Sequence, residues 1–299
     1  MNMKARRIRI NGFTDIPRLM SKLNVTTLPD FFILSESVNK SMPRAEVIDK
    51  MERVLNALEE SIVGALSQPN NTESGMVAGG ASLLQQFSAA GGSLLGTAFS
   101  QVICNAMAVA EHNACMGRIV AAPTAGSCGV IPGALLTVAE RHHITHERLL
   151  RSLFVAGGIG DIISIRASLS GSTHGCQAEN GSASAMTAAA IVALFVDDLS
   201  TIESAAAFGL KNLLGLTCDP VGGLVELPCV KRNVVAAANA VACAEMALAG
   251  IKTVIPLDEV IDTMAAIGNS IPSTLRETSK GGLAVTETGQ RIAATLRDK

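Results

Sequence analysis

The chain has 299 residues, of which 48% are hydrophobic and 17% charged, and its 24 Lys and Arg nearly balance its 26 Asp and Glu. A chain of this length and apolar content, with a net charge of −2, can bury a sizeable core, which excludes disorder over most of its length. Balanced charge and 3% aromatic residues also argue against binding to nucleic acid.

Two long uncharged stretches require a membrane protein to be considered. They lie between Glu73 and Glu111 and between Arg118 and Glu140, and each exceeds the roughly 20 residues that a spanning helix needs. Both stretches contain polar or helix-breaking residues, and the chain has no Trp or Tyr to anchor a span at the membrane surface. We therefore expect buried helices and no membrane association. The scarcity of charge predicts that another chain covers part of the surface.

The N-terminus and the cysteines indicate the compartment. The basic residues before Ile8 are followed by Arg9 and not by an apolar core, so no signal peptide is predicted. Seven cysteines, an odd number, favour free thiols in a reducing cytoplasm over a disulfide framework.

The first part of the chain contains one clear helix. Residues 6–11 alternate with period two and predict a short strand. From Pro43 to Leu66, apolar residues recur every three or four positions, which predicts an amphipathic helix with Ser41 as a possible cap. The polar loop Ser67 to Ser74 follows.

This loop predicts a boundary between an N-terminal amphipathic helical segment, 1–74, and a helical domain, 75–299, that contains most of the Gly-rich turns and all seven cysteines. Beyond it, apolar Ala-rich stretches predict helices over 81–87, 94–116, 130–141, 147–156, 182–196, 201–214, 232–248 and 258–267. The predicted fold is all-α: an Ala- and Gly-rich multi-helix bundle, with a short N-terminal β element at most.

Gly-rich turns separate these predicted helices. They cover 91–92, 122–129, 157–160, 171–181, 218–228 and 281–282. Glycine lets backbone N–H groups approach a ligand closely. In the turn 122–129, Thr124, Gly126 and Ser127 precede an apolar helix, so the turn is a candidate seat for a substrate carboxylate, the alternative being an ordinary Gly-rich turn.

The cysteines divide into two groups. Those inside apolar stretches, and the one in the turn 122–129, are expected to pack in the core: Cys104, Cys115, Cys128 and Cys243. The others, each at a loop or helix edge beside Gly or Pro, are Cys176, Cys218 and Cys229. Their spacing matches no zinc ribbon or ferredoxin, but three thiolates meeting from separate loops would suit a [4Fe–4S] cluster with one open iron.

Basic side chains near these cysteines have several interpretations. Lys231 and Arg232 follow Cys229 closely, so either can pair with a substrate carboxylate, offset the charge of a thiolate-bound cluster, or simply start a solvated helix. His174 precedes Cys176 by two residues and is the histidine nearest a metal there. The remaining histidines are expected in a solvated turn, at 142, 143 and 146, or packed in a helix, at 112.

Longer motifs carry a resemblance to a known family. They are Ala121-Ala122-Pro123-Thr124-Ala125-Gly126-Ser127, Gly175-Cys176-Gln177-Ala178-Glu179, Cys218-Asp219-Pro220-Val221-Gly222-Gly223-Leu224-Val225 through Pro228-Cys229, Arg232-Asn233, Pro256-Leu257-Asp258-Glu259-Val260, Arg276-Glu277-Thr278 and Gly281-Gly282-Leu283-Ala284. From about Gly75 to its end, the chain resembles the α chain of the iron–sulfur-dependent L-serine dehydratases.

The resemblance implies a [4Fe–4S] cluster held by Cys176, Cys218 and Cys229, whose open iron would take the serine hydroxyl and carboxylate. The implied reaction converts L-serine to pyruvate and ammonia without pyridoxal phosphate. The catalytic base stays unassigned.

Two departures from the family pattern qualify what the resemblance implies. The family also has a β part with a Ser-Ser-His-Thr type motif, which this sequence lacks, so the resemblance implies a separate β subunit and an oligomer. Family members often have Glu where this chain has Thr173, before His174, which leaves the amino-acid substrate open. The alternatives are a related iron–sulfur lyase, such as a cysteine desulfidase, and a noncatalytic metal-binding helical subunit.

Overall fold

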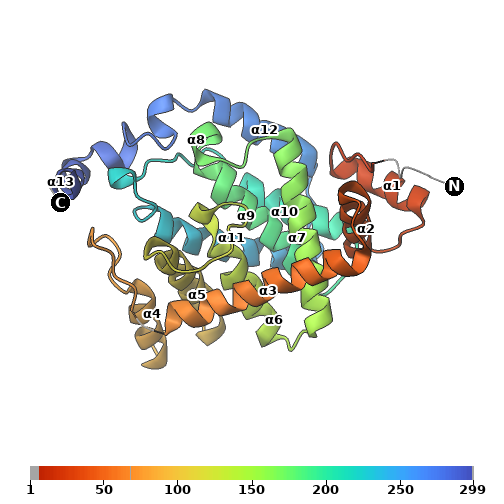
Figure 1. Ribbon diagram of the computed structural model, residues 1–299, viewed down its shortest axis with the longest axis horizontal. Coiled ribbons are helices and arrows are strands. Elements are labelled where there is room, and N and C mark those ends of the chain that lie inside the picture. The colour runs from red at the N-terminus through yellow and green to blue at the C-terminus, as the bar shows by residue number, and fades with distance from the viewer. Residues whose placement is uncertain (1–6, 68, 298–299) are drawn as a thin grey trace.

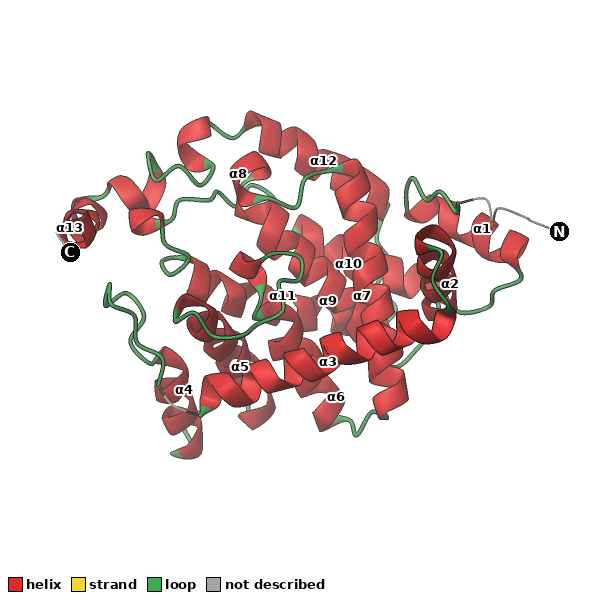
Figure 2. Ribbon diagram, viewed as in Figure 1, coloured by secondary structure: helices red, strands yellow, loops and turns green. Residues whose placement is uncertain are grey.

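The computed structural model describes residues 7–67 and 69–297, and most of these residues form helices joined by loops (Figures 1 and 2). In chain order the α-helices are α1 (Ile16–Leu23), α2 (Leu28–Lys40), α3 (Arg44–Leu66), α4 (Gly80–Ala89), α5 (Thr97–Ala114), α6 (Thr137–Arg141), α7 (His146–Arg166), α8 (Gly171–His174), α9 (Ser182–Ala193), α10 (Leu199–Lys211), α11 (Cys229–Leu248), α12 (Leu257–Ser270) and α13 (Glu287–Arg297). Over the described residues no β-strand forms, only two isolated bridges, so the predicted all-α class is confirmed.

Helix α9 lies at the centre of the bundle. Every residue from Ser182 to Ala193 is buried, because this stretch is apolar or small on all sides. Helices α7, α10 and α11 pack around it (Figure 1). The small Ala side chains let these neighbours approach closely, and the N-terminal end of α9 continues directly from the segment that contains Cys176.

The predicted turn at 157–160 is wrong, because helix α7 continues through it to Arg166. Two of its glycines make room for neighbouring side chains. A Cβ on Gly158 would lie 2.2 Å from the Phe32 ring of α2, and one on Gly160 would lie 3.0 Å from Met186 of α9. These glycines therefore serve close packing inside a helix and do not break it.

The predicted turn at 171–181 is also wrong. It contains the short helix α8 and a π-helical turn, Gln177–Gly181, that leads into α9. Gly181 packs against α10, where an added Cβ would lie 3.3 Å from Leu210. The segment is therefore ordered helical structure that carries Cys176 between its two parts.

The predicted strand at 6–11 does not form over residues 7–11, and residue 6 lies outside the described ranges. These residues are extended, but their backbone pairs with a side chain. The Ile8 N–H donates to Asn39 Oδ1 at 2.9 Å, and Asn39 Nδ2 donates to the Ile8 carbonyl at 3.0 Å. An amide side chain of α2 thus replaces a partner strand.

The helix predicted from Pro43 to Leu66 is confirmed as α3, but Ser41 does not cap it. Ser41 has a φ of 53° and ends α2, while Pro43 precedes the first turn of α3. Helices α1, α2 and α13 were not predicted. The remaining predicted helices are present with shifted ends; α5 begins at Thr97, and α6 follows a π-helical turn, Pro132–Leu136.

The division into 1–74 and 75–299 stays a prediction. Buried residues from both sides of the proposed boundary, such as Phe31 and Leu55 before it and Ile159 after it, belong to one hydrophobic core. Among the described residues, none of the helices combines the length and apolar character that crossing a membrane requires.

Candidate functional site

Two of the three loop cysteines meet in the folded chain. The side-chain ligand atoms of Cys176, Glu179 and Cys218 all lie within 4.8 Å of one another. Cys176 stands between α8 and the π-helical turn, and Cys218 lies in the loop after α10. Residues 42 positions apart therefore place two thiols beside one carboxyl group.

Backbone contacts hold the Cys176 segment against the loop before Cys218. Gly175 has a φ of +79°, and a Cβ there would lie 2.7 Å from the Leu216 carbonyl oxygen. The Gln177 N–H donates to that same carbonyl at 3.0 Å, and the Gly215 N–H donates to Gln177 Oε1 at 2.9 Å. Only glycine fits this close approach without strain, so the local sequence fixes the position of Cys176.

Cys218 is held from its other side by the segment before α13. Its N–H donates to the Leu275 carbonyl at 2.9 Å, and its carbonyl accepts from the Glu277 N–H at 2.7 Å. Gly171 faces the same thiol, because a Cβ on Gly171 would lie 3.0 Å from Cys218 Sγ and 2.6 Å from Glu179 Oε2. A side chain at 171 would displace one of these two groups.

Cys229, the third predicted ligand, begins α11 and is buried. Burial is the main cause that raises its pKa to about 12, and the charges of Cys176 and Glu179 raise it further. The third thiol is therefore within electrostatic reach of the other two groups, although it lies outside the closest group.

Arg232, one turn after Cys229, lies beside the thiols. Its guanidinium donates to Cys176 Sγ at 3.5 Å, to the Thr217 carbonyl at 2.7 Å and to Asp219 at 2.8 Å. A hydrogen bond from Cys218 is the main cause that lowers the pKa of Cys176, and the positive charge of Arg232 lowers it further. The arrangement favours a thiolate at Cys176.

Glu179 connects this group to the Gly-rich turn 122–129. Its Oε1 accepts a 2.7 Å hydrogen bond from the Thr124 hydroxyl. Burial raises the pKa of Glu179, and the Thr124 hydrogen bond opposes that effect. A Cβ on Gly126 would lie 2.9 Å from the same carboxylate oxygen, so glycine lets the turn approach Glu179.

The turn itself is tied to α11 by Asn233. This buried side chain accepts from the Gly129 N–H at 2.8 Å and donates to the Gly126 carbonyl at 2.7 Å and the Cys229 carbonyl at 3.0 Å. Ser127, which is buried, accepts and donates only within the turn. Thr124 and Gly126 thus border Glu179, and Ser127 supports the turn.

His174 is buried, and it is not part of the group formed by Cys176, Glu179 and Cys218. Its Nδ1 accepts from the Ser168 N–H at 3.2 Å, and its ring packs beneath Gly268 of α12. The other cysteines are all free thiols: Cys104, Cys128 and Cys243 are buried, and Cys115 is half-buried. His146 is exposed and pairs with Glu52.

Sequence reasoning assigned no role to three residues of the site: Glu179, Asp219 and Asn233. Each lies within four residues of a predicted ligand in the sequence. Glu179 follows Cys176 by three residues, Asp219 adjoins Cys218, and Asn233 follows Cys229 by four. These offsets are the signal that could have identified them, because residues three or four apart share one face of a helix. The site carboxylate thus follows Cys176, whereas Thr173 stands at the position where the family often has Glu.

This chain is similar to known proteins over most of its length. The family described as "Serine dehydratase alpha chain" matches residues 16–284. A "Probable L-serine dehydratase, alpha chain" from Bacillus subtilis is 44% identical over 265 residues, which are 89% of this chain and 88% of the relative. An "L-serine dehydratase, alpha chain" from Peptoniphilus asaccharolyticus is 38% identical over 263 residues, 88% of this chain and 90% of the relative.

A longer relative matches only in part. "L-serine dehydratase TdcG" from Escherichia coli is 42% identical over 184 residues, which are 60% of this chain but 40% of the relative. The match of the family over most of the chain, together with the two alpha chains of similar extent, decides the assignment. This chain belongs to the serine dehydratase alpha chain family.

Proposed function

We propose that this chain is the alpha subunit of an iron–sulfur-dependent L-serine ammonia-lyase, which converts L-serine to pyruvate and ammonia. The observation that carries the proposal is the meeting of Cys176, Cys218 and Glu179 within 4.8 Å, from segments far apart in the sequence. The names of the alpha-chain relatives support serine as the substrate.

The chemistry of the donor set fits a [4Fe–4S] cluster held by Cys176, Cys218 and Cys229. Thiolates are the usual ligands of such clusters, and Arg232 supplies positive charge beside them. Next to Glu179, the side-chain amide of Asn180 is buried with no hydrogen-bond partner among the described residues, so this segment has unused polar groups. When bound, a cluster with one open iron supplies a Lewis acid for a substrate hydroxyl.

The residues of the chain supply the remaining functions. A base takes the Cα proton of serine, the Cβ hydroxyl leaves as water, and the resulting 2-aminoacrylate hydrolyses to pyruvate and ammonia. Glu179 is the carboxyl group beside the thiols, and Thr124 fixes its orientation. We assign it as the site's proton-holding group, since a half-buried carboxyl with a raised pKa suits that role. The turn with Thr124, Gly126 and Ser127, together with Arg232, borders the substrate space.

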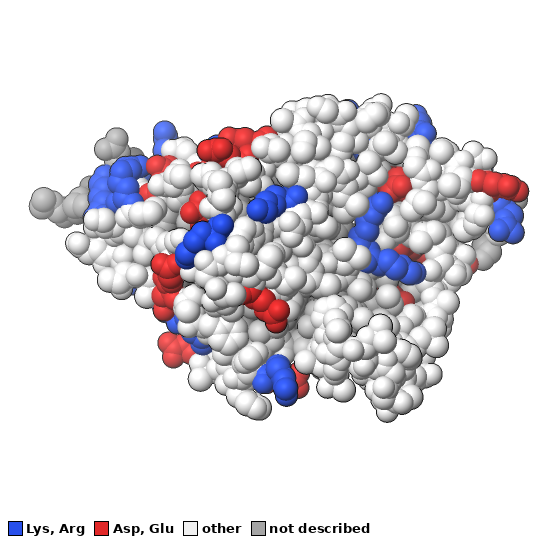
Figure 3. Space-filling model, turned by 180° about the vertical axis from the view of Figure 1, so that it is seen from behind, with Lys and Arg blue, Asp and Glu red and all other residues white. Residues whose placement is uncertain are grey.

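A separate β subunit completes the proposed enzyme. The match to this chain covers 40% of the longer relative, which supports a further part of the enzyme on a separate chain. Exposed apolar side chains on and after α4 offer a surface for a partner: Leu83, Phe87, Leu94 and Leu95. Figure 3 also shows that wide areas of one face carry no Lys, Arg, Asp or Glu side chains. All seven cysteines are free, which supports a reducing cytoplasm as the location.

Anaerobic purification with and without the β subunit tests the proposal. We expect a brown protein with about four irons per chain, as for a [4Fe–4S] cluster, and pyruvate formed from L-serine when the β subunit is present. Iron without serine turnover in that complex would favour a lyase for another amino acid, such as cysteine. Colourless, iron-free protein would favour a noncatalytic subunit and overturn the proposal.

A further inference from the structure

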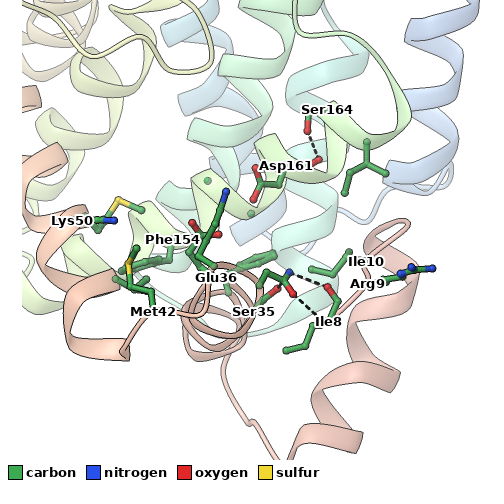
Figure 4. Close-up of a pocket in the computed structure, with 18 of the residues that line it drawn as sticks. Ile8, Arg9, Ile10, Ser35, Glu36, Met42, Lys50, Phe154, Asp161 and Ser164 are labelled. Atoms are coloured by element: carbon green, nitrogen blue, oxygen red, sulfur yellow. Dashed lines mark hydrogen bonds between the residues drawn. The ribbon is translucent and has the colours of Figure 1, made fainter. Parts of the chain in front are cut away.

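A cavity lies away from the cysteines. It has a volume of about 640 Å³, is partly open at the surface, and is lined by residues 8–11, α2, Met42, α3 and the C-terminal half of α7 (Figure 4). This volume is within the usual range of small-molecule sites. None of the cavity-lining residues belongs to the cysteine site, so the cavity needs its own explanation.

Most of the cavity wall is apolar. The lining side chains of this kind are Ile8, Ile10, Phe32, Met42, Val47, Met51, Val54, Phe154 and Ile165. Figure 4 places Met42 on one side of the cavity and Ile8 and Ile10 on the other. Such walls suit the hydrocarbon part of a small ligand.

Charged groups of both signs also line the cavity. Asp161 comes from α7, and Glu36 and Lys40 come from α2. Among the described residues, none of these three side chains makes a hydrogen bond or ion pair with another side chain. Burial by the surrounding helices raises the pKa of Asp161, the charge of Glu36 raises it further, and Lys40 opposes both. These three side chains are exposed, so two carboxyl groups and an ammonium group without fixed partners stand at the rim of the cavity, where Arg9 adds a guanidinium group.

Gly157 keeps the cavity open. It lies in the interior of α7 and lines the cavity, and an added Cβ would meet nothing within 4 Å. Its neighbour Gly158 differs, because a Cβ there would strike Phe32 at 2.2 Å. Glycine inside a helix costs about 1 kcal/mol relative to alanine. Packing explains Gly158 but not Gly157, whose missing side chain leaves space for an occupant.

We propose that this cavity binds a free α-amino acid with an apolar side chain. Its ammonium group would pair with Asp161 and Glu36, its carboxylate with Lys40, and its side chain would contact the apolar wall. A zwitterion is the ligand class that satisfies both signs of unpartnered charge next to an apolar surface. The proposal is independent of the reaction at the cysteine site.

Calorimetric titration of the full chain with L-leucine tests the proposal. We expect saturable binding of one equivalent. Two analogues of matched shape should bind at least about tenfold more weakly, since each loses one charge-assisted contact. These are 4-methylpentanoate, which lacks the ammonium group, and 3-methylbutylamine, which lacks the carboxylate.

Variants locate the binding. Gly157→Leu should place a branched side chain in the space that the ligand needs and abolish binding, whereas Gly157→Ala leaves most of that space and should retain it. Asp161→Asn should weaken binding about tenfold, as expected for the loss of a charged hydrogen-bond partner. Cys176→Ala should bind L-leucine as the parent chain does. Circular dichroism verifies that each variant is folded.

Two results would overturn the proposal. One is the absence of saturable binding of L-leucine to the parent chain. The other is binding that survives in Gly157→Leu and Asp161→Asn, or that is lost in Cys176→Ala alone, because the amino acid would then bind elsewhere. If Gly157→Leu does not fold, Asp161→Asn and the two analogues still decide between these outcomes.

Discussion

The Thr124 hydroxyl donates a 2.7 Å hydrogen bond to the Glu179 carboxylate, across 55 residues of sequence. This contact joins the Gly-rich turn to the segment that carries Cys176. It also gives one oxygen of this half-buried carboxylate a fixed partner, so that the other oxygen faces Cys176 Sγ at 3.9 Å. The orientation of Glu179 at the site therefore depends on a residue from a different turn.

Replacing Thr124 tests this dependence. Thr124→Val removes the hydroxyl at nearly constant volume and should lower kcat for L-serine at least about tenfold, since a charged group loses a hydrogen bond. Thr124→Ser keeps the hydroxyl and should retain most of the activity. Steady-state kinetics of the complex with the β subunit provide the measurement. Equal activity in Thr124→Val and the parent would contradict a role for the Thr124 hydroxyl in orienting Glu179.

Glu179→Gln changes the charge and keeps the shape. The amide oxygen can still accept from Thr124, so we expect a folded protein that retains iron but loses most of its serine turnover. Iron content and pyruvate formation are measured on the same sample. Full activity in Glu179→Gln would contradict a proton-holding role for this residue.

The cysteines give a prediction with internal controls. Replacing Cys176, Cys218 or Cys229 by Ala should abolish iron retention and activity. Replacing the buried Cys104 or Cys243 by Ala should cost about 1–2 kcal/mol of stability through a small cavity and leave the iron in place. Iron analysis after anaerobic purification separates the two groups. Equal iron loss in all five variants would contradict the ligand assignment.

Arg232 should resist exchange for lysine. Its guanidinium contacts Cys176, Thr217 and Asp219 at once, and a lysine ammonium cannot span these three acceptors in the same geometry. Arg232→Lys should therefore lose iron faster than the parent on exposure to a chelator, while the exposed control Arg291→Lys behaves as the parent. Identical loss rates in both variants would show that charge alone suffices.

Asn233 is expected to matter for stability. Asn233→Ala removes two hydrogen bonds between the turn 122–129 and α11, and a third within α11 to the Cys229 carbonyl. Leaving their backbone partners unpaired should lower the free energy of unfolding by about 3 kcal/mol. Urea denaturation measures this change, with the exposed α11 variant Glu245→Ala as a control near zero. A loss below about 1 kcal/mol would indicate that water replaces these bonds.

Asp161 gives a prediction of pH dependence. Its pKa is raised in the folded chain, so ionisation destabilises the fold as pH rises from the unfolded pKa of about 4 through the higher folded pKa. Asp161→Asn removes that penalty and should stabilise the chain at neutral pH, with the gain disappearing below about pH 4. The charges around it are Arg9, Glu36, Lys40 and Lys50. Urea unfolding across this pH range provides the measurement, and a constant difference would contradict it.

Helix periodicity predicted much of the fold because it depends on local patterns of apolar residues. The stretch from Pro43 to Leu66 became α3 as expected. Two of the wrong predictions were turns placed at glycine residues that lie inside helical segments in the structure. The glycines at 157–160 resemble a turn when the sequence is considered alone. In the structure they lie inside α7, where Gly158 packs closely against Phe32 and Gly160 against Met186. The strand predicted at 6–11 does not form over residues 7–11, where the Ile8 backbone pairs with the Asn39 side chain and the Asn11 N–H with Asp15.

The amino-acid order by itself determined the helical class and the burial of Cys104, Cys128 and Cys243, because each follows from neighbouring residue types; Cys115, also expected in the core, is half-buried at the end of α5. Only the tertiary structure decided that Glu179 joins Cys176 and Cys218, that Thr124 orients it, and that Gly157 opens a cavity away from the cysteines. Such contacts join segments far apart in the chain, and their energies depend on packing and burial that no local pattern records.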